Sequence, residues 1–183
     1  MESHLDNISG GRQVTSRVLL ALAHGFGVGR VRLAPGTFGS LLGLLWFLVL
    51  VWPRHFGVFA AGAFGGVLAS VWVCGAAERI LERTDPPSVV LDEIVAVPLC
   101  YVGWVAWLWL KTGEMPSPGF FFTGPSCWGT AGVFVAFRIL DIGKPWPISA
   151  SQRLPGGWGV TLDDVMAACY VNAAAAALWL FAR

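Results

Sequence analysis

The sequence predicts an all-α protein: a polytopic membrane helical bundle with about four to five transmembrane or re-entrant helices. Hydrophobic residues make up 56% of the 183 residues and charged residues only 13%, about half the share in an ordinary soluble domain. The mean hydropathy is +0.66. Long apolar runs, each near the roughly 20 residues that cross a bilayer, alternate with polar loops. The net charge of +1 and the dispersed basic residues argue against a nucleic-acid-binding protein.

The elements follow from these runs in chain order. Residues 1–17 are polar and are predicted to be a flexible N-terminal tail, so residues 18–183 form a single integral membrane domain. The first part of that domain is short and amphipathic, and we expect it to lie on the membrane surface. Prolines and glycines weaken the first and fourth of the later runs, and the first either spans or re-enters. The candidate spans are 33–52, 58–77, 94–110, 119–137 and 165–182.

Charged residues predict the orientation of these spans. With the N-terminus in the cytoplasm and five crossings, nine of the twelve Lys and Arg residues fall on the cytoplasmic side, as the positive-inside rule requires. The same threading places eight of the eleven acidic residues in two loops on that side, 78–93 and 138–164. Acidic residues contribute little to orientation, so insertion does not explain their asymmetry. We therefore expect a functional site on the cytoplasmic face.

Two acidic pairs are the main candidates for that site. Asp92-Glu93 directly precedes the third run, and Asp163-Asp164 directly precedes the fifth. A carboxylate beside hydrocarbon is costly unless it binds a cation or pairs with another group. Mg²⁺ takes oxygen ligands, chiefly carboxylates and water. The two pairs therefore predict a Mg²⁺ site, for one ion or a close pair, with these four acidic side chains as candidate ligands, directly or through water.

Helix capping is the alternative reading for two of the acidic residues. Thr161 and Asp164 have the spacing of a capping box, and Asp85 before proline has the pattern of an N-cap. Capping does not explain Asp92 and Glu93, because they follow three apolar residues in mid-run.

Two further strings suggest phosphate binding. Arg138 and Lys144 flank Asp141 at the end of the fourth run, and they offer a planar fork and a point charge to phosphate oxygens. A basic membrane anchor with snorkelling side chains is the alternative. A glycine-rich turn enters the first run, and its backbone N–H groups and hydroxyls suit an anion or simply make a turn. Its candidate residues are Gly36, Thr37 and Ser40.

Four strings in this order resemble the bacterial phosphatidylglycerophosphatase A family. They span most of the chain, and their joint specificity is higher than that of any one. Thr84 stands where the family usually has a histidine, Ala96 replaces a common glycine, and Ala167-Ala168 replaces Ala-Gly. The strings are Leu33–Ser40, Asp85 with Val89–Glu93, Phe137–Pro147 and Gly157–Asp164.

The resemblance implies a Mg²⁺-dependent phosphoric monoester hydrolase of the bacterial inner (cytoplasmic) membrane. Such an enzyme converts phosphatidylglycerophosphate to phosphatidylglycerol and inorganic phosphate. Arg138 and Lys144 would then neutralise the phosphate, and Asp141 or Asp85 would orient the attacking water or protonate the leaving oxygen. The expected partners are the substrate and the bilayer, with no obligate protein partner.

A small ion-coupled membrane transporter is the alternative function, because acidic residues within membranes often relay cations. It predicts acidic residues accessible from both sides and an inverted repeat. The nearly acid-free outer loops and the lack of an internal repeat favour the enzyme.

Overall fold

The computed structural model describes the backbone of residues 2–181 and the side chains of residues 13–178. All regular secondary structure in these ranges is helical, which confirms the predicted all-α class. The elements are α1 (Glu2–Ala23), η1 (Gly25–Arg30), α2 (Pro35–Val51), α3 (Phe56–Leu81), α4 (Leu91–Cys100), α5 (Val102–Thr112), η2 (Pro118–Phe122), α6 (Gly124–Gly143), α7 (Ile148–Ser151) and α8 (Gly157–Phe181).

Three of the five apolar runs become single helices, namely α2, α3 and α8. The fourth run, 119–137, is divided between η2 and α6 at Thr123, and the third run, 94–110, is divided between α4 and α5 at Tyr101. Pro98 has no backbone N–H to continue the helical ladder, and the N–H of Tyr101 turns back to the Pro98 carbonyl at 3.2 Å. The break changes the direction of the chain below the first acidic pair.

Two helical segments in the described part of the chain are long and apolar enough to cross a membrane, namely Phe56–Leu81 and Leu91–Thr112. The helix Pro35–Val51 is apolar but shorter. A total of four to five membrane helices therefore stays a prediction. Residues 2–17, the predicted flexible tail, have helical backbone as part of α1, and their flexibility stays a prediction too.

Both capping predictions are wrong. α8 begins at Gly157, so Thr161 lies inside the helix, where its hydroxyl contacts that of Ser70 at 3.0 Å. No helix starts after Asp85, whose backbone N–H donates to the Glu78 carboxylate at 2.8 Å. The acidic pair that seemed to lie in mid-run, Asp92-Glu93, occupies the first turn of α4. Carboxylates are favoured there because the helix dipole is positive at that end.

Close packing against α3 accounts for the early start of α8. A Cβ on Gly157 would overlap the carbonyl oxygen of Val71, and one on Gly75 would lie 3.0 Å from the backbone nitrogen of Gly157. Only glycine permits this approach of two backbones. It pins the first turn of α8 to α3 and sets the rotation of the turns that follow.

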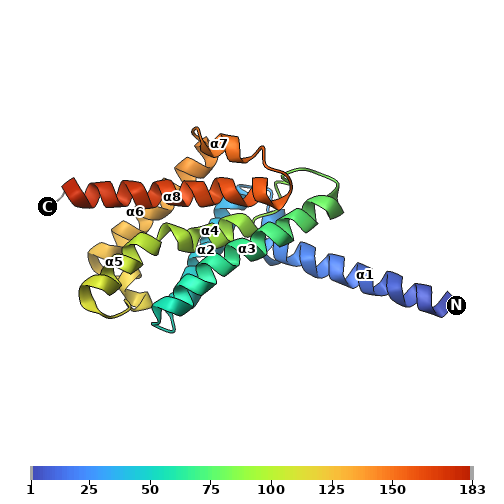
Figure 1. Cartoon of the computed structure of the whole chain (residues 1–183), viewed down its shortest axis with the longest axis horizontal. Coiled ribbons are helices and arrows are strands. Elements are labelled where there is room, and N and C mark those ends of the chain that lie inside the picture. The colour runs from blue at the N-terminus through green and yellow to red at the C-terminus, as the bar shows by residue number, and fades with distance from the viewer. Residues whose placement is uncertain (1, 182–183) are drawn as a thin grey trace.

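α4 is the central helix and contacts α2, α3, α6 and α8 (Figure 1). α1 extends away from one end of this bundle, and the C-terminal part of α8 extends from the other (Figure 1). Helix ends meet around the start of α4: the N-terminal parts of α2 and α8 and the C-terminal part of α6. Farther along, Phe47 stacks on Tyr101 with ring centroids 4.3 Å apart, within an apolar core.

Candidate active site

Three of the four predicted metal ligands converge. One oxygen from each of Asp92, Glu93 and Asp164 lies within 4.8 Å of the other two. Asp92 and Glu93 come from the first turn of α4, and Asp164 comes from the third turn of α8. We call these three residues the carboxylate trio. Its members are 72 or 71 residues apart in sequence across the two helices, so only the tertiary packing of α4 on α8 brings them together.

The trio contains polar atoms that lack partners within the described protein. Oδ1 of Asp92, Oε2 of Glu93 and Oδ2 of Asp164 are all buried without a hydrogen bond. Native proteins rarely leave buried oxygens unsatisfied, because each one costs on the order of 1–3 kcal/mol. Three carboxylates that converge, each with an unpartnered buried oxygen, fit a hard divalent cation, which takes carboxylate oxygens as ligands.

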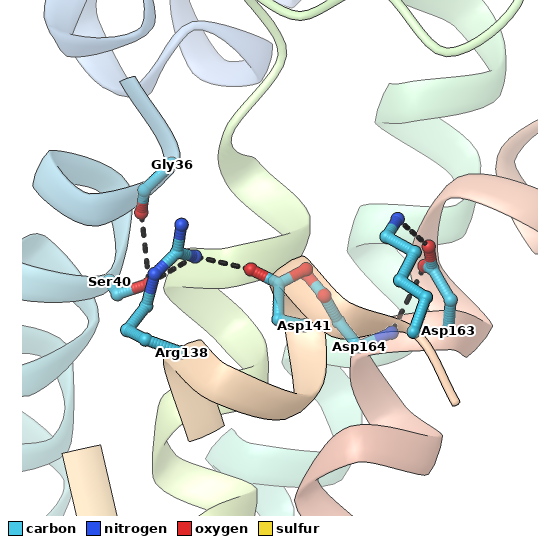
Figure 2. A network of polar contacts seen from close by, with 7 residues as sticks. Gly36, Ser40, Arg138, Asp141, Asp163 and Asp164 are labelled. Atoms are coloured by element: carbon cyan, nitrogen blue, oxygen red, sulfur yellow. Dashed lines mark hydrogen bonds and ion pairs between the residues drawn. The ribbon is translucent and has the colours of Figure 1, made fainter. Parts of the chain in front are cut away.

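Asp163 lies outside the trio. Its carboxylate forms an ion pair with Lys144 and accepts a hydrogen bond from Nε2 of Gln152 at 3.2 Å. Its other oxygen accepts the backbone N–H of Asp164 at 3.0 Å. The two neighbouring acids of α8 therefore have different surroundings (Figure 2). The charge of Asp163 is already neutralised by the ammonium group of Lys144.

Lys144 is held in place by the end of α6. It is the C-cap of that helix and has a left-handed backbone, with φ of 40°. Burial alone would lower the pKa of Lys144, but the hydrogen bond and charge of Asp163 outweigh it and raise that pKa above its usual range. The ammonium group therefore stays charged at neutral pH, at the edge of the acidic site.

The guanidinium of Arg138 lies on the other side of the trio. It forms an ion pair with Asp141, one turn later on α6, and donates to Oγ of Ser40 at 3.2 Å. Ser40 in turn donates to the carbonyl oxygen of Gly36 at 2.9 Å. Figure 2 shows these residues and Asp164 in one continuous row, with Asp141 facing Asp164. Nε of Arg138 is buried without a partner in the described structure.

Gly36 is the point of closest approach between α2 and the charged groups. A Cβ added there would overlap Oε1 of Glu93 and lie 3.1 Å from a terminal nitrogen of Arg138. A larger residue at this position would have to displace the side-chain ends of Glu93 and Arg138. Pro35 occupies the first helical position of α2 and has no backbone N–H. The backbone of Gly36 therefore presents the positive N-terminal end of the helix to these charged groups.

Two predicted site residues are placed less closely. Thr37 is half-buried in the first turn of α2, and its backbone N–H binds the carbonyl of Ala34 at 3.0 Å. Asp85 is exposed in the loop before α4, yet near enough to Asp92 and Asp163 to act on both electrostatically. The sequence did not point to Gln152, a lone amide in a loop with no motif around it.

Comparisons with known proteins identify the family of this chain. Residues 21–179 match the family model described as phosphatidylglycerophosphatase A. The chain is 32% identical over 148 residues to phosphatidylglycerophosphatase A of Escherichia coli (strain K12), covering 80% of this chain and 74% of that one. It is also 32% identical over 155 residues to phosphatidylglycerophosphatase A of Haemophilus influenzae, covering 81% of each chain.

A third relative, from Bacteroides thetaiotaomicron, is 31% identical over 155 residues, covering 80% of this chain and 84% of that one. It is provisionally named a phosphatidylinositol-3-phosphatase. The comparison with solved structures found no match. The family match covers most of the chain and confirms the resemblance seen in the sequence. The chain therefore belongs to the phosphatidylglycerophosphatase A family.

Proposed function

We propose that the protein is a Mg²⁺-dependent lipid phosphatase that hydrolyses phosphatidylglycerophosphate to phosphatidylglycerol and inorganic phosphate. The observation that carries the proposal is the carboxylate trio, with its unpartnered buried oxygens, beside two cationic side chains. The names of the two phosphatidylglycerophosphatase A relatives support the same substrate.

Asp92, Glu93 and Asp164 would hold the Mg²⁺ ion. When bound, the ion would neutralise charge on the phosphate oxygens and favour deprotonation of a nearby water. Asp163 was predicted as a fourth ligand, but its ion pair with Lys144 supports a different task. In our proposal Asp163 positions Lys144 and Gln152 at the rim of the trio.

Phosphate binding falls to groups that carry positive charge or free donors. Arg138 presents a guanidinium anchored by Asp141 and Ser40, so little side-chain entropy is lost when it binds an anion. Lys144 adds a second charge from the opposite side of the trio. The Gly36 backbone at the positive end of α2 lies against the guanidinium and suits a phosphate oxygen.

Proton transfer is assigned to two acidic residues outside the trio. Asp141 is 8% exposed and lies between Arg138 and Asp164, where it would orient the attacking water. Asp85 stands on the exposed loop before α4, near enough to Asp92 to act on it electrostatically, and it would protonate the leaving glycerol oxygen.

Exposed apolar stripes support the placement of this site at a membrane. Phe64, Leu68 and Trp72 on α3 are spaced four residues apart and are 57%, 66% and 64% exposed. Leu45 and Val49 on α2 are 57% and 58% exposed. Such continuous apolar faces are stable in lipid rather than in water. We propose a multi-pass inner-membrane protein with the N-terminus and the site on the cytoplasmic side, as the charge distribution predicts.

Phosphate release from phosphatidylglycerophosphate tests the function. We expect the purified protein in detergent to release phosphate, EDTA to abolish release, and added Mg²⁺ to restore it. Release that persists in EDTA would reject the metal-dependent mechanism. No release at all, together with cation flux through the protein in vesicles, would favour the transporter. The same assay with phosphatidylinositol 3-phosphate tests the substrate suggested by the Bacteroides relative.

A further inference from the structure

An apolar groove begins below the candidate active site. It has a volume of about 660 Å³, within the usual range for small-molecule sites, and lies between α5, α6 and α8. Its walls include Trp104 and Trp107 on α5, Gly132 and Ala136 on α6, and Val171 and Asn172 on α8. None of the groups proposed for the reaction lines it.

The groove and the carboxylate trio share their supporting helices. Ala136 lies two residues before Arg138 on α6, and Val171 lies seven residues after Asp164 on α8. At 1.5 Å per residue, the groove starts about 10 Å from the acidic residues. It continues for about another 10 Å, to the level of Leu178. A site at the membrane surface would place this stretch within one leaflet, whose hydrocarbon is about 15 Å deep.

The amide in the lining does not need a polar ligand to satisfy its hydrogen bonds. Asn172 is the one amide side chain in it, and its polar atoms are already used. Its oxygen accepts from the Gly103 N–H at 2.8 Å, and its nitrogen donates to the carbonyls of Leu99 and Ala168, both at 2.8 Å. An occupant therefore meets aromatic, aliphatic and small side chains only.

The place of the groove favours a hydrocarbon chain as its occupant. The groove is lined by apolar side chains and begins on the same helices that carry the polar groups of the candidate active site. A lipid phosphate has the same order of parts, because its acyl chains are attached next to a polar headgroup.

We propose that the groove binds an acyl chain of the lipid substrate while its phosphate lies at the carboxylate trio. The inference rests on the proposed lipid phosphatase function and extends it, because it makes the diacylglycerol part of the substrate a recognised element. The groove lies between α6 and α8, so a chain bound there would leave the headgroup toward Arg138 and Asp164.

A matched pair of glycine substitutions tests the groove. Gly132 and Gly65 both lie inside helices, are exposed, and have open space where a Cβ would be added, but only Gly132 lines the groove. Gly132→Leu fills the slot, and Gly65→Leu on α3 controls for a leucine introduced at a helical glycine. The substrates are long-chain phosphatidylglycerophosphate and its deacylated, water-soluble headgroup.

We expect Gly132→Leu to lower the ratio of kcat/KM for the lipid to kcat/KM for the headgroup at least tenfold, and Gly65→Leu to leave it within twofold of wild type. A ratio that stays unchanged in Gly132→Leu, whether both activities are retained or fall equally, would overturn the proposal. If the wild type releases no phosphate from any lipid phosphate, the proposed function fails, and a binding experiment decides on the groove.

That experiment uses phosphatidylglycerol with a photoreactive diazirine at the end of one acyl chain. We expect crosslinks within residues 129–136 and 171–178 of the wild type and of Gly65→Leu, and their loss in Gly132→Leu. Crosslinks elsewhere only, or unchanged labelling in Gly132→Leu, would overturn the proposal. So would a change from dimer to monomer in Gly132→Leu without loss of labelling, because the groove would then be a contact between two copies.

Discussion

Replacing Asp164 with asparagine tests whether the carboxylate trio binds a cation. It removes the charge repulsion that destabilises the metal-free protein, and it also removes one of the proposed ligands. The amide has nearly the same shape as the carboxylate but no charge, so packing of α8 on α4 is preserved. If the trio exists to hold a cation, the variant is more stable than wild type without metal and no longer responds to metal. A structural carboxylate predicts the reverse, because its removal would take away a needed interaction.

The expected size follows from the geometry of the trio. The three oxygens lie within 4.8 Å of one another. Each ionised pair therefore repels by about 3.5 kcal/mol at an effective dielectric constant of 20. Asp164→Asn removes two of the three pairs, about 7 kcal/mol in total. In the metal-free wild type, protonation of one carboxylate at pH 7 costs about 4 kcal/mol and relieves the same repulsion. The gain in unfolding free energy from Asp164→Asn therefore cannot exceed about 4 kcal/mol. We expect a metal-free gain of about 1–4 kcal/mol.

Thermal unfolding in detergent, with EDTA and across a Mg²⁺ titration, measures both effects. Wild type should gain stability with Mg²⁺, and Asp164→Asn should melt several degrees higher in EDTA while its apparent Mg²⁺ affinity falls at least 100-fold. Loss of an outer partner of a metal ligand already costs 10–100-fold. Glu114→Gln, an exposed acid outside the site, is the control. A variant that melts lower in EDTA and keeps the Mg²⁺ shift would refute the metal site.

Three further substitutions probe the surroundings of the trio. Gly36→Ala should lower kcat/KM roughly 10- to 100-fold with an unchanged circular dichroism spectrum, because its Cβ displaces Glu93 by overpacking worth about 1–3 kcal/mol; wild-type kinetics would contradict the close approach. Arg138→Lys keeps the charge but loses the planar fork, so phosphate release should fall about tenfold or more, and full activity would show that charge alone suffices. Thr161→Val should lower the melting temperature by a few degrees through loss of its buried bond to Ser70, about 1–3 kcal/mol, with little further loss in the double variant with Ser70→Ala.

Helix positions were largely predictable from the apolar runs. A helix that lies in an apolar environment needs a continuous run of apolar residues about as long as itself. The runs that became α2, α3 and α8 are continuous in sequence and in structure. The exceptions have local causes that outweigh the pattern. Pro98 breaks the third run through its missing N–H, and Gly157 starts α8 earlier than the capping pattern around Thr161 suggested. That early start depends on backbone contact with α3, which no local pattern reveals.

The composition of the site was predictable as a set, but its division of labour was not. Successive residues on a helix point about 100° apart, so two neighbouring acids need not share an ion: Asp92 and Glu93 both reach the trio, but of the second pair only Asp164 does. Which of them turns toward α4 depends on the rotation of α8, and that rotation follows from the glycine contact with α3 and the Ser70–Thr161 bond. The capping alternative would have removed Asp164 from the ligands and left Asp163. The packing instead turns Asp164 toward the trio and pairs Asp163 with Lys144. A substitution at Thr161 that rotates α8 should therefore weaken the metal response without touching any carboxylate.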